Sequence, residues 1–185
     1  MIVTSLTRHT ESGRFLQLVS VFSAGLMVAL TLAWYGSGPD GVGVAMRNSA
    51  RFSSVVFAVA LAARVGLRAV GWMHAFVVAH VVHYATVSYA AVTNVHHHLH
   101  SIDARNAVVI VFGVLLLLVL ASTSSSRRTL WRRVNAVAVF IVGAVFAGSA
   151  VLNAARSRAA VIPAVAVLVG LTIHLYRRYL RSRAR

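Results

Sequence analysis

The sequence predicts an all-α fold, an integral membrane bundle of about six transmembrane helices. Of its 185 residues, 59% are hydrophobic and 11% are charged, whereas soluble domains carry about 25% charged residues. The hydrophobic residues gather in six runs, most of which approach the roughly 20 residues that a helix needs to cross a bilayer. These runs lack the two-residue alternation of barrel strands, so helices are the structure that satisfies their backbone groups in lipid. The runs are Phe15–Tyr35, Phe52–Val70, Trp72–Val95, Asn106–Ala121, Val134–Ala155 and Ala159–Tyr176.

The first run follows a polar N-terminal segment, residues 1–14, which contains Arg8 and Arg14. No small-residue cleavage site follows the run, so we expect a retained first helix and not a signal peptide. The stretch GSGPDGVG, Gly36 to Gly43, is rich in turn-forming residues and is expected to close this helix as a loop.

The second run is the least apolar of the six. Only Phe52–Ala63 is free of charge, between Arg51 and Arg64. The run crosses a bilayer only if Arg64 and Arg68 extend their long side chains towards the headgroups. The two arginines are four residues apart and therefore share one helix face.

The remaining runs carry features of membrane spans. Pro163 falls in the first turn of the last run, where proline is tolerated. The arginine-rich tail, residues 177–185, is suited to anionic lipid at the membrane surface. One transmembrane domain, residues 1–185, accounts for the chain. Aromatic residues typical of a membrane interface flank several runs: Trp34, Tyr35, Trp72 and Trp131.

The arginines predict the orientation. Net charge is +15, and all 18 basic residues are arginine. With six spans and the N-terminus inside, 13 arginines fall on the cytoplasmic side and 5 on the other. This bias predicts a multi-pass protein of the cell membrane with both termini in the cytoplasm. Nucleic acid is not an expected partner, because the arginines lie at the ends of apolar runs. The 13 are Arg8, Arg14, Arg64, Arg68, Arg127, Arg128, Arg132, Arg133, Arg177, Arg178, Arg181, Arg183 and Arg185, and the 5 are Arg47, Arg51, Arg105, Arg156 and Arg158.

Three histidines lie within the apolar third run: His74, His80 and His83. On a helix, His80 and His83 are about 60° apart, whereas His74 lies about 180° from His83. His80 is eight residues beyond Trp72, roughly 12 Å along the axis, and hence within the hydrocarbon. Ionisable residues at such depth usually face the bundle interior and mark a functional site.

Two interpretations of the His80 and His83 pair stay open. Neutral imidazole ligates haem iron, copper and zinc, and neighbouring small and aromatic residues would suit a flat cofactor slot. Alternatively, the histidines form hydrogen bonds between helices, worth about 0.6–2 kcal/mol each. For His74, which is closer to the interface, the pattern favours the hydrogen-bonding interpretation.

A second cluster, HHHLH, ends the third run and makes His96, His98 and His100 candidate metal ligands. His96 and His100 are four residues apart and could chelate Zn²⁺ or Cu²⁺ if the helix continues that far. The alternative is a solvated histidine-rich loop. Diiron enzymes need three histidine boxes at one depth, which the sequence lacks.

Three segments together resemble the ferric reductase-like transmembrane superfamily. MRNSARFSSVVFAVALAARV (Met46–Val65) resembles its second span, and LRAVGWMHAFVVAHVVHY (Leu67–Tyr84) resembles its next helix with a His-x-x-His pair. LLVLASTSSSRRTLWRRVNAVAVFIVGAVF (Leu117–Phe146) resembles its later Trp-Arg junction. The resemblance covers about Met46 to Ala155 and agrees with six spans.

The resemblance implies b-type haem, held by histidines of the third and fifth spans, and electron transfer across or into the membrane. His80 matches the main third-span ligand, and His83 is the neighbouring motif histidine. The fifth-span histidine is replaced by Asn135, and Val134–Ala155 contains no histidine. His174, near the inner end of the sixth run, is the candidate replacement ligand.

The functional expectation is a haem-b electron-transfer protein, at most the membrane subunit of an oxidoreductase. The chain has no nucleotide-binding glycine motif, so electrons would come from quinol or a redox partner subunit. Cysteine is absent, which excludes disulfides, iron–sulfur clusters and thiolate-ligated haem. Two alternatives remain: a non-catalytic bundle of the same fold without haem, and a histidine-rich metal-binding membrane protein.

Overall fold

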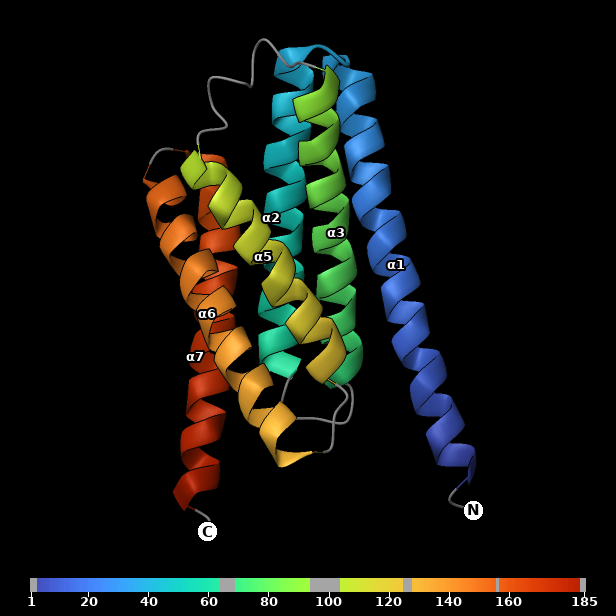
Figure 1. Ribbon diagram of the computed structural model, residues 1–185, viewed down its shortest axis with the longest axis vertical. Coiled ribbons are helices and arrows are strands. Elements are labelled where there is room, and N and C mark those ends of the chain that lie inside the picture. The colour runs from blue at the N-terminus through green and yellow to red at the C-terminus, as the bar shows by residue number, and fades with distance from the viewer. Residues whose placement is uncertain (1–2, 64–68, 94–103, 125–127, 156, 184–185) are drawn as a thin grey trace.

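The computed structural model describes residues 3–63, 69–93, 104–124, 128–155 and 157–183. Within these residues, long helices follow one another up and down a common axis, with no strand (Figure 1). The helices are α1 (Val3–Tyr35), α2 (Pro39–Ala63), α3 (Ala69–Thr93), α5 (Ala104–Thr123), α6 (Thr129–Ala154) and α7 (Val161–Arg183), with a short 3-10 turn, η1 (Arg158–Ala160). The predicted all-α bundle of about six helices is confirmed.

Several of these helices are suited to a bilayer. Four are long and apolar enough to cross one: Gly13–Tyr35, Val70–Thr93, Thr129–Ala154 and Arg158–Arg177. The described part of α5 adds a shorter apolar stretch, Val111–Thr123. Large apolar side chains are exposed along them, and on α1 these include Phe15, Leu18, Phe22, Leu30 and Trp34. Such an extensive apolar surface is what surrounding lipid requires, so the chain is a multi-pass membrane protein.

The second helix differs from the expectation for Phe52–Val70. It begins at Pro39, because proline is favoured at the first helical position, and the loop shrinks to a turn at Gly36, whose φ is 82°. Arg47 and Arg51 therefore lie inside α2 and not in the loop before it. The helix ends at Ala63 and is not among the four apolar spans. The predicted placement of Arg64 and Arg68 lies outside the described residues.

The terminal helices are longer than the apolar runs. α1 begins at Val3, so most of the polar segment 1–14 extends the first helix, since no proline separates the two and Gly13 is accommodated within the helix. α7 continues to Arg183, which makes residues 177–183 of the tail helical. The short 3-10 turn η1 precedes α7.

The central helix is α2, which packs against α1, α3 and α7. A Cβ atom at Gly170 of α7 would lie 2.6 Å from the carbonyl oxygen of Ala58, so only glycine permits this close approach of α7 to α2. The Arg177 guanidinium donates a hydrogen bond of 2.6 Å to the carbonyl oxygen of Ala62, in the last turn of α2. This bond adds a polar contact between α7 and α2.

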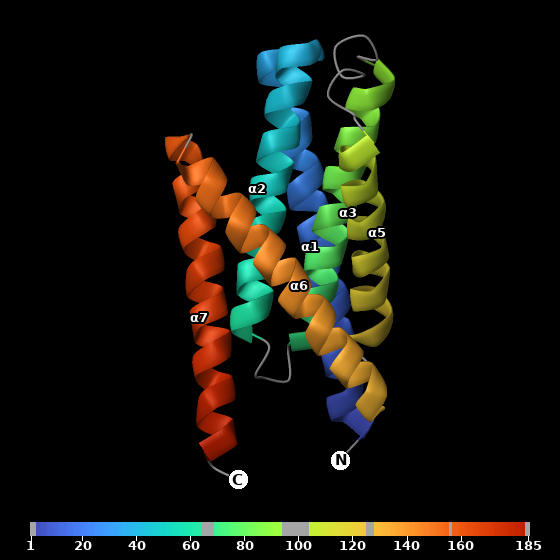
Figure 2. The same ribbon diagram turned by 60° about the vertical axis from the view of Figure 1, so that its left-hand side comes forward.

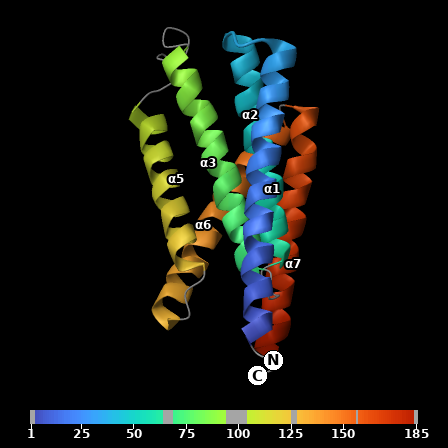
Figure 3. The ribbon, with the colours of Figure 1, turned by 90° about the vertical axis from the view of Figure 1, so that its right-hand side faces the viewer.

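The remaining helices complete the bundle around α2 and α3. α1 lies along α2 and α3 (Figure 3), while α6 runs obliquely from the end of α5 to the start of α7 (Figure 2). Both chain termini lie at one end of the bundle (Figure 1). We name that end the proximal end, and the opposite end, where α2 begins, the distal end.

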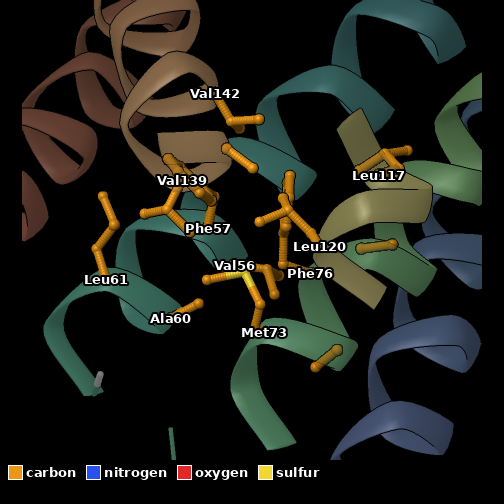
Figure 4. Packing of buried hydrophobic residues seen from close by; sticks show 13 residues of the cluster. Val56, Phe57, Ala60, Leu61, Met73, Phe76, Leu117, Leu120, Val139 and Val142 are labelled. Carbon is orange, nitrogen blue, oxygen red and sulfur yellow. The ribbon is translucent and has the colours of Figure 1, made fainter. Parts of the chain in front are cut away.

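An apolar core fills the space between α2, α3, α5 and α6. Its side chains point toward one another between the helices (Figure 4). Phe57 lies with its ring centre 4.7 Å from that of Phe76 and 5.2 Å from that of Phe146. Phe76 and Phe146 also contact His80, so this aromatic group separates the apolar core from His80 and His83. The core comprises Val56, Phe57, Ala60, Leu61, Met73, Ala75, Phe76, Ala79, Leu117, Leu120, Ala138, Val139 and Val142.

Candidate functional site

Two side-chain hydrogen bonds join α2 to α3 at the predicted histidines. Ser49 Oγ lies 3.0 Å from His83 Nδ1, and Ser53 Oγ lies 2.9 Å from His80 Nδ1. Because the helices are antiparallel, serines four residues apart meet histidines three residues apart in matched pairs. Both serines are fully buried, at 1% and 0% exposed. The structure thus brings His80 and His83 together on one face of α3.

The hydrogen-bond network assigns the tautomer of both imidazoles. Ser49 Oγ also bonds the carbonyl oxygen of Met46 at 2.9 Å, and Ser53 Oγ bonds that of Ala50 at 3.0 Å. A carbonyl oxygen only accepts, and a hydroxyl has a single hydrogen to donate. Each serine oxygen therefore accepts from Nδ1–H of its histidine. The lone pair of each neutral ring is left on Nε2, the atom that can bind a metal.

Aromatic rings surround His80. Its ring centre lies 5.2 Å from that of His83, 4.9 Å from Tyr84, and 5.5 Å from both Phe76 and Phe146. The tilt between the two imidazoles is 49°. His80 is thus held from α2 by a hydrogen bond and from α3 and α6 by ring contacts, which fixes the direction of its Nε2.

Both histidines line a cavity of about 530 Å³ between α2, α3, α6 and the start of α7. Its volume is in the range of small-molecule and cofactor sites. His80 also lines a second cavity of about 100 Å³, whose other walls are mainly apolar residues of α5 and α6. The larger cavity is lined by Arg47, Ala50, Arg51, Ser54, His80, His83, Val145, Phe146, Ser149, Asn153, Ser157, Ala160 and Pro163.

The larger cavity has a polar distal part and an apolar floor. Asn153 and Ser157 lie where α6 gives way to α7, at the distal end, while Phe146 lies two turns deeper on α6. His83 is ten residues before Thr93, the distal end of the α3 span, which corresponds to about 15 Å along the axis. The imidazoles therefore lie near the middle of the apolar span of α3.

His74 has a different setting. Its Nε2 lies 3.2 Å from the carbonyl oxygen of Ala121 and 2.7 Å from Ser124 Oγ, both at the proximal end of α5. Because the carbonyl only accepts, Nε2 carries the hydrogen, which is the opposite tautomer to that of His80 and His83. The expectation that His74 forms a hydrogen bond between helices is confirmed.

Asn135, at the position where the resemblance expects a ligand histidine, is buried at the proximal end. Its Nδ2 donates a hydrogen bond of 2.8 Å to Thr123 Oγ1, which donates in turn to the carbonyl oxygen of Val119 at 2.6 Å. Phe146, the α6 residue at the cavity floor, is eleven residues further on, about 16 Å along the axis. Asn135 therefore joins α6 to α5 and does not face His80.

The other candidate ligands are not brought to this cavity. His174 lies eleven residues beyond Pro163, the cavity-lining residue of α7, and so about 16 Å further along that helix. His96, His98 and His100 lie outside the described residues. Within the described ranges, no group of three or more His, Cys, Asp or Glu residues is placed to hold a metal ion.

Sequence analysis missed four polar residues of the site. Ser49 and Ser53 anchor the imidazoles, and Arg47 and Arg51 line the cavity beside them. A signal was present, because the four residues recur at alternate positions before an apolar run. Spacings of four within each pair place like residues on one helix face. On a helix the serine pair and the arginine pair are about 200° apart, so the pattern indicates two polar faces, one toward α3 and one toward the cavity.

His80 and His83 are both on α3, so they suit a ligand that binds imidazole on one of its faces only. A porphyrin supplies four of the ligands of its iron, so one imidazole Nε2 is enough to hold haem. Two histidines three residues apart on one helix cannot bind opposite faces of one macrocycle. Across the cavity, none of the described lining residues of α6 and α7 is a histidine. The cavity fits ligation by one imidazole and does not fit ligation by two.

No protein-family model, no curated protein and no solved structure matches this chain. The resemblance to ferric reductase-like proteins therefore stays a prediction. The orientation of the two imidazoles toward the cavity is the observation that bears on function.

Proposed function

We propose that this chain is a membrane protein that binds haem b in the larger cavity through one imidazole and carries electrons as the membrane subunit of an oxidoreductase. The observation that supports it is the anchoring of Nδ1 in His80 and His83 by buried serines, which leaves Nε2 available at the cavity. When bound, haem would supply one-electron redox chemistry.

The residues around the imidazoles have distinct parts in this proposal. Ser49 and Ser53 hold the rings in one tautomer and orientation, as hydrogen-bond acceptors behind metal-binding histidines do. Phe76 and Phe146 present an apolar floor that keeps water from the deeper ring. The resemblance favours His80 as the ligand, and His83 is the alternative on the next turn.

The sequence also bears on the source of the electrons. With no nucleotide-binding motif in the sequence, electrons would come from quinol or from a separate redox subunit. We further propose that the protein lies in the cell membrane with its proximal end in the cytoplasm. The arginine bias and the common location of both termini support that orientation.

A bare transition-metal ion is a second candidate, favoured by one distance. Two imidazoles that bind one tetrahedral ion at about 2.0–2.1 Å have ring centres about 5 Å apart, and those of His80 and His83 are 5.2 Å apart. Two protein ligands are fewer than the three or four of stable zinc sites. The smaller donor number makes haem the preferred ligand.

The deciding experiment is an optical spectrum of detergent-purified protein from haem-replete cells, with metal analysis of the same sample. We expect a dithionite-reduced α band, a pyridine hemochrome of haem b, and about one iron per chain. The variants His80→Ala and His83→Ala then identify the ligand, with His74→Ala as the matched control that keeps its haem. A colourless preparation with stoichiometric copper or zinc supports the second candidate. A colourless, metal-free preparation at full yield overturns both and leaves the non-catalytic bundle.

A further inference from the structure

Two arginine side chains of α2 line the larger cavity: Arg47, which is exposed and lies with Nη1 beside Gly43, and Arg51, which is half-buried. Arg47 and Arg51 are one turn apart on α2, so they share a face, and both line the larger cavity. They lie in sequence on either side of Ser49, whose hydroxyl meets His83 about 15 Å from the distal end of the α3 span. Arginine within a bundle of membrane helices is uncommon and usually faces the bundle interior or a water-filled cavity.

Neither arginine is neutralised by a described residue. Of the three acidic residues in the chain, none lines the cavity among its described wall residues. Asp40 is exposed in the first turn of α2, and among the described residues it forms no ion pair with Arg47 or Arg51. Arg51 Nη1 donates to the neutral Asn48 Oδ1 at 3.3 Å. Two neighbouring positive charges at the wall of one cavity attract an anion.

Neutral donors surround the same space. Asn153 Nδ2 donates one hydrogen to Ser149 Oγ at 3.1 Å and keeps a second hydrogen, and Ser157 lies one turn beyond. Polar groups from α2, α6 and the connection to α7 therefore converge on the distal part of the cavity. A phosphate group offers more oxygen acceptors than a carboxylate, and the guanidinium fork matches its geometry.

We propose that the distal part of this cavity is a phosphate site, in which Arg47 and Arg51 bind the phosphate of an anionic membrane lipid or a free phosphate ion. The site needs only the two guanidinium groups and their neutral neighbours. Its test does not require bound haem, although haem and the phosphate ligand would share the cavity of about 530 Å³. Exposed apolar side chains on α6 and α7, such as Leu152 and Ile162 near the distal end, would contact the acyl chains of a lipid bound there.

The test uses the full chain purified in neutral detergent without haem supplementation. Binding is measured by native mass spectrometry and by the rise in melting temperature, with phosphatidylglycerol, with phosphatidylcholine, and with inorganic phosphate against chloride at equal ionic strength. We expect saturable binding of phosphatidylglycerol and about 10-fold weaker binding of phosphatidylcholine, because both lipids carry the phosphate but the choline ammonium places a further positive charge beside the two guanidinium groups.

The variants compare arginines at one end of the bundle. Arg47→Gln with Arg51→Gln should weaken binding of the phosphate ligand at least about 10-fold. Arg158→Gln is the matched control, because Arg158 is exposed in η1 at the distal end and does not line the cavity. Binding should be unchanged in that variant.

The ligand that binds distinguishes a lipid headgroup from a free phosphate ion. Lipid binding without an effect of inorganic phosphate identifies a headgroup, and phosphate binding that displaces the lipid identifies a free anion. The proposal is overturned if wild-type protein shows no saturable binding of either ligand, a result that needs no variant to fold. It is equally overturned if the double variant and the Arg158 control bind alike.

Discussion

One helix, α3, carries histidines in two settings that differ in which ring nitrogen is anchored. At the proximal end, His74 donates from Nε2 to the end of α5. In the middle of the bundle, His80 and His83 donate from Nδ1 to serines of α2, and their Nε2 atoms remain for the cavity. The residue type and the apolar surroundings are alike. The anchored nitrogen decides whether an imidazole fastens two helices or serves a ligand.

The largest expected effect comes from replacing His80 and His83 together. The double variant His80→Ala/His83→Ala should lose all bound haem, because no other described imidazole lines the cavity. Free imidazole added to this variant should restore part of the haem absorbance by entering the space left by the rings. Haem retained at the wild-type level by the double variant would contradict the assignment of these residues.

The serines behind the rings should give the next largest effect. Ser49→Ala and Ser53→Ala free the imidazoles to rotate and to change tautomer, which should weaken haem affinity by about 10–100-fold. Thr86→Ala is the control, since Thr86 Oγ1 donates to the carbonyl oxygen of Val82 in its own helix at 2.9 Å and does not line the cavity. Haem titration of the apoproteins measures the affinities. Equal affinities in all three variants would show that the serines do not position the rings.

At the proximal end, the corresponding substitution should affect stability alone. Ser124→Ala removes one partner of His74 Nε2 and should lower the free energy of unfolding by about 0.6–2 kcal/mol. Haem content should stay at the wild-type level. Denaturant titration in detergent micelles, followed by helical circular dichroism, measures the first quantity, and the pyridine hemochrome measures the second.

The smallest expected effect concerns Asn135. The variant Asn135→His restores the histidine that the family resemblance expects, yet the residue lies about 16 Å along α6 from the cavity floor. The absorption spectrum of bound haem should therefore be unchanged. A shift to the spectrum of a haem with two imidazoles would mean that α6 faces α3 in another register.

Hydropathy predicted the class and most of the helices, because α3, α6 and α7 display continuous apolar runs. It misplaced the start of α2, since Arg47 and Arg51 resemble the flank of a span when no neighbour is known. The position of His80 and His83 deep within the third apolar run was enough to select them as candidate site residues. Their partners Ser49 and Ser53 lie 34 and 27 residues away in sequence, and only antiparallel packing of α2 on α3 brings them together.

The position of His174 shows a further limit of prediction from sequence. Local sequence indicates that a histidine or an arginine lies in a span, but it does not show which face the side chain takes. The replacement ligand proposed at His174 depended on the depth of two helices, and the structure puts the α7 lining of the cavity near Pro163 instead. Depth along a helix could be estimated from the sequence, whereas the crossing of α6 over the bundle could not.

The polarity of α2 has a consequence for biogenesis. Flanked on three sides by α1, α3 and α7, this segment is absent from the apolar spans, and its arginines oppose partition from the translocon into lipid on their own. We expect it to remain at the protein-conducting channel until α3 emerges, and to leave as a hairpin with its serines already capped by imidazole. The hydrogen bonds between the serines of α2 and the histidines of α3 would then also help α2 to enter the membrane.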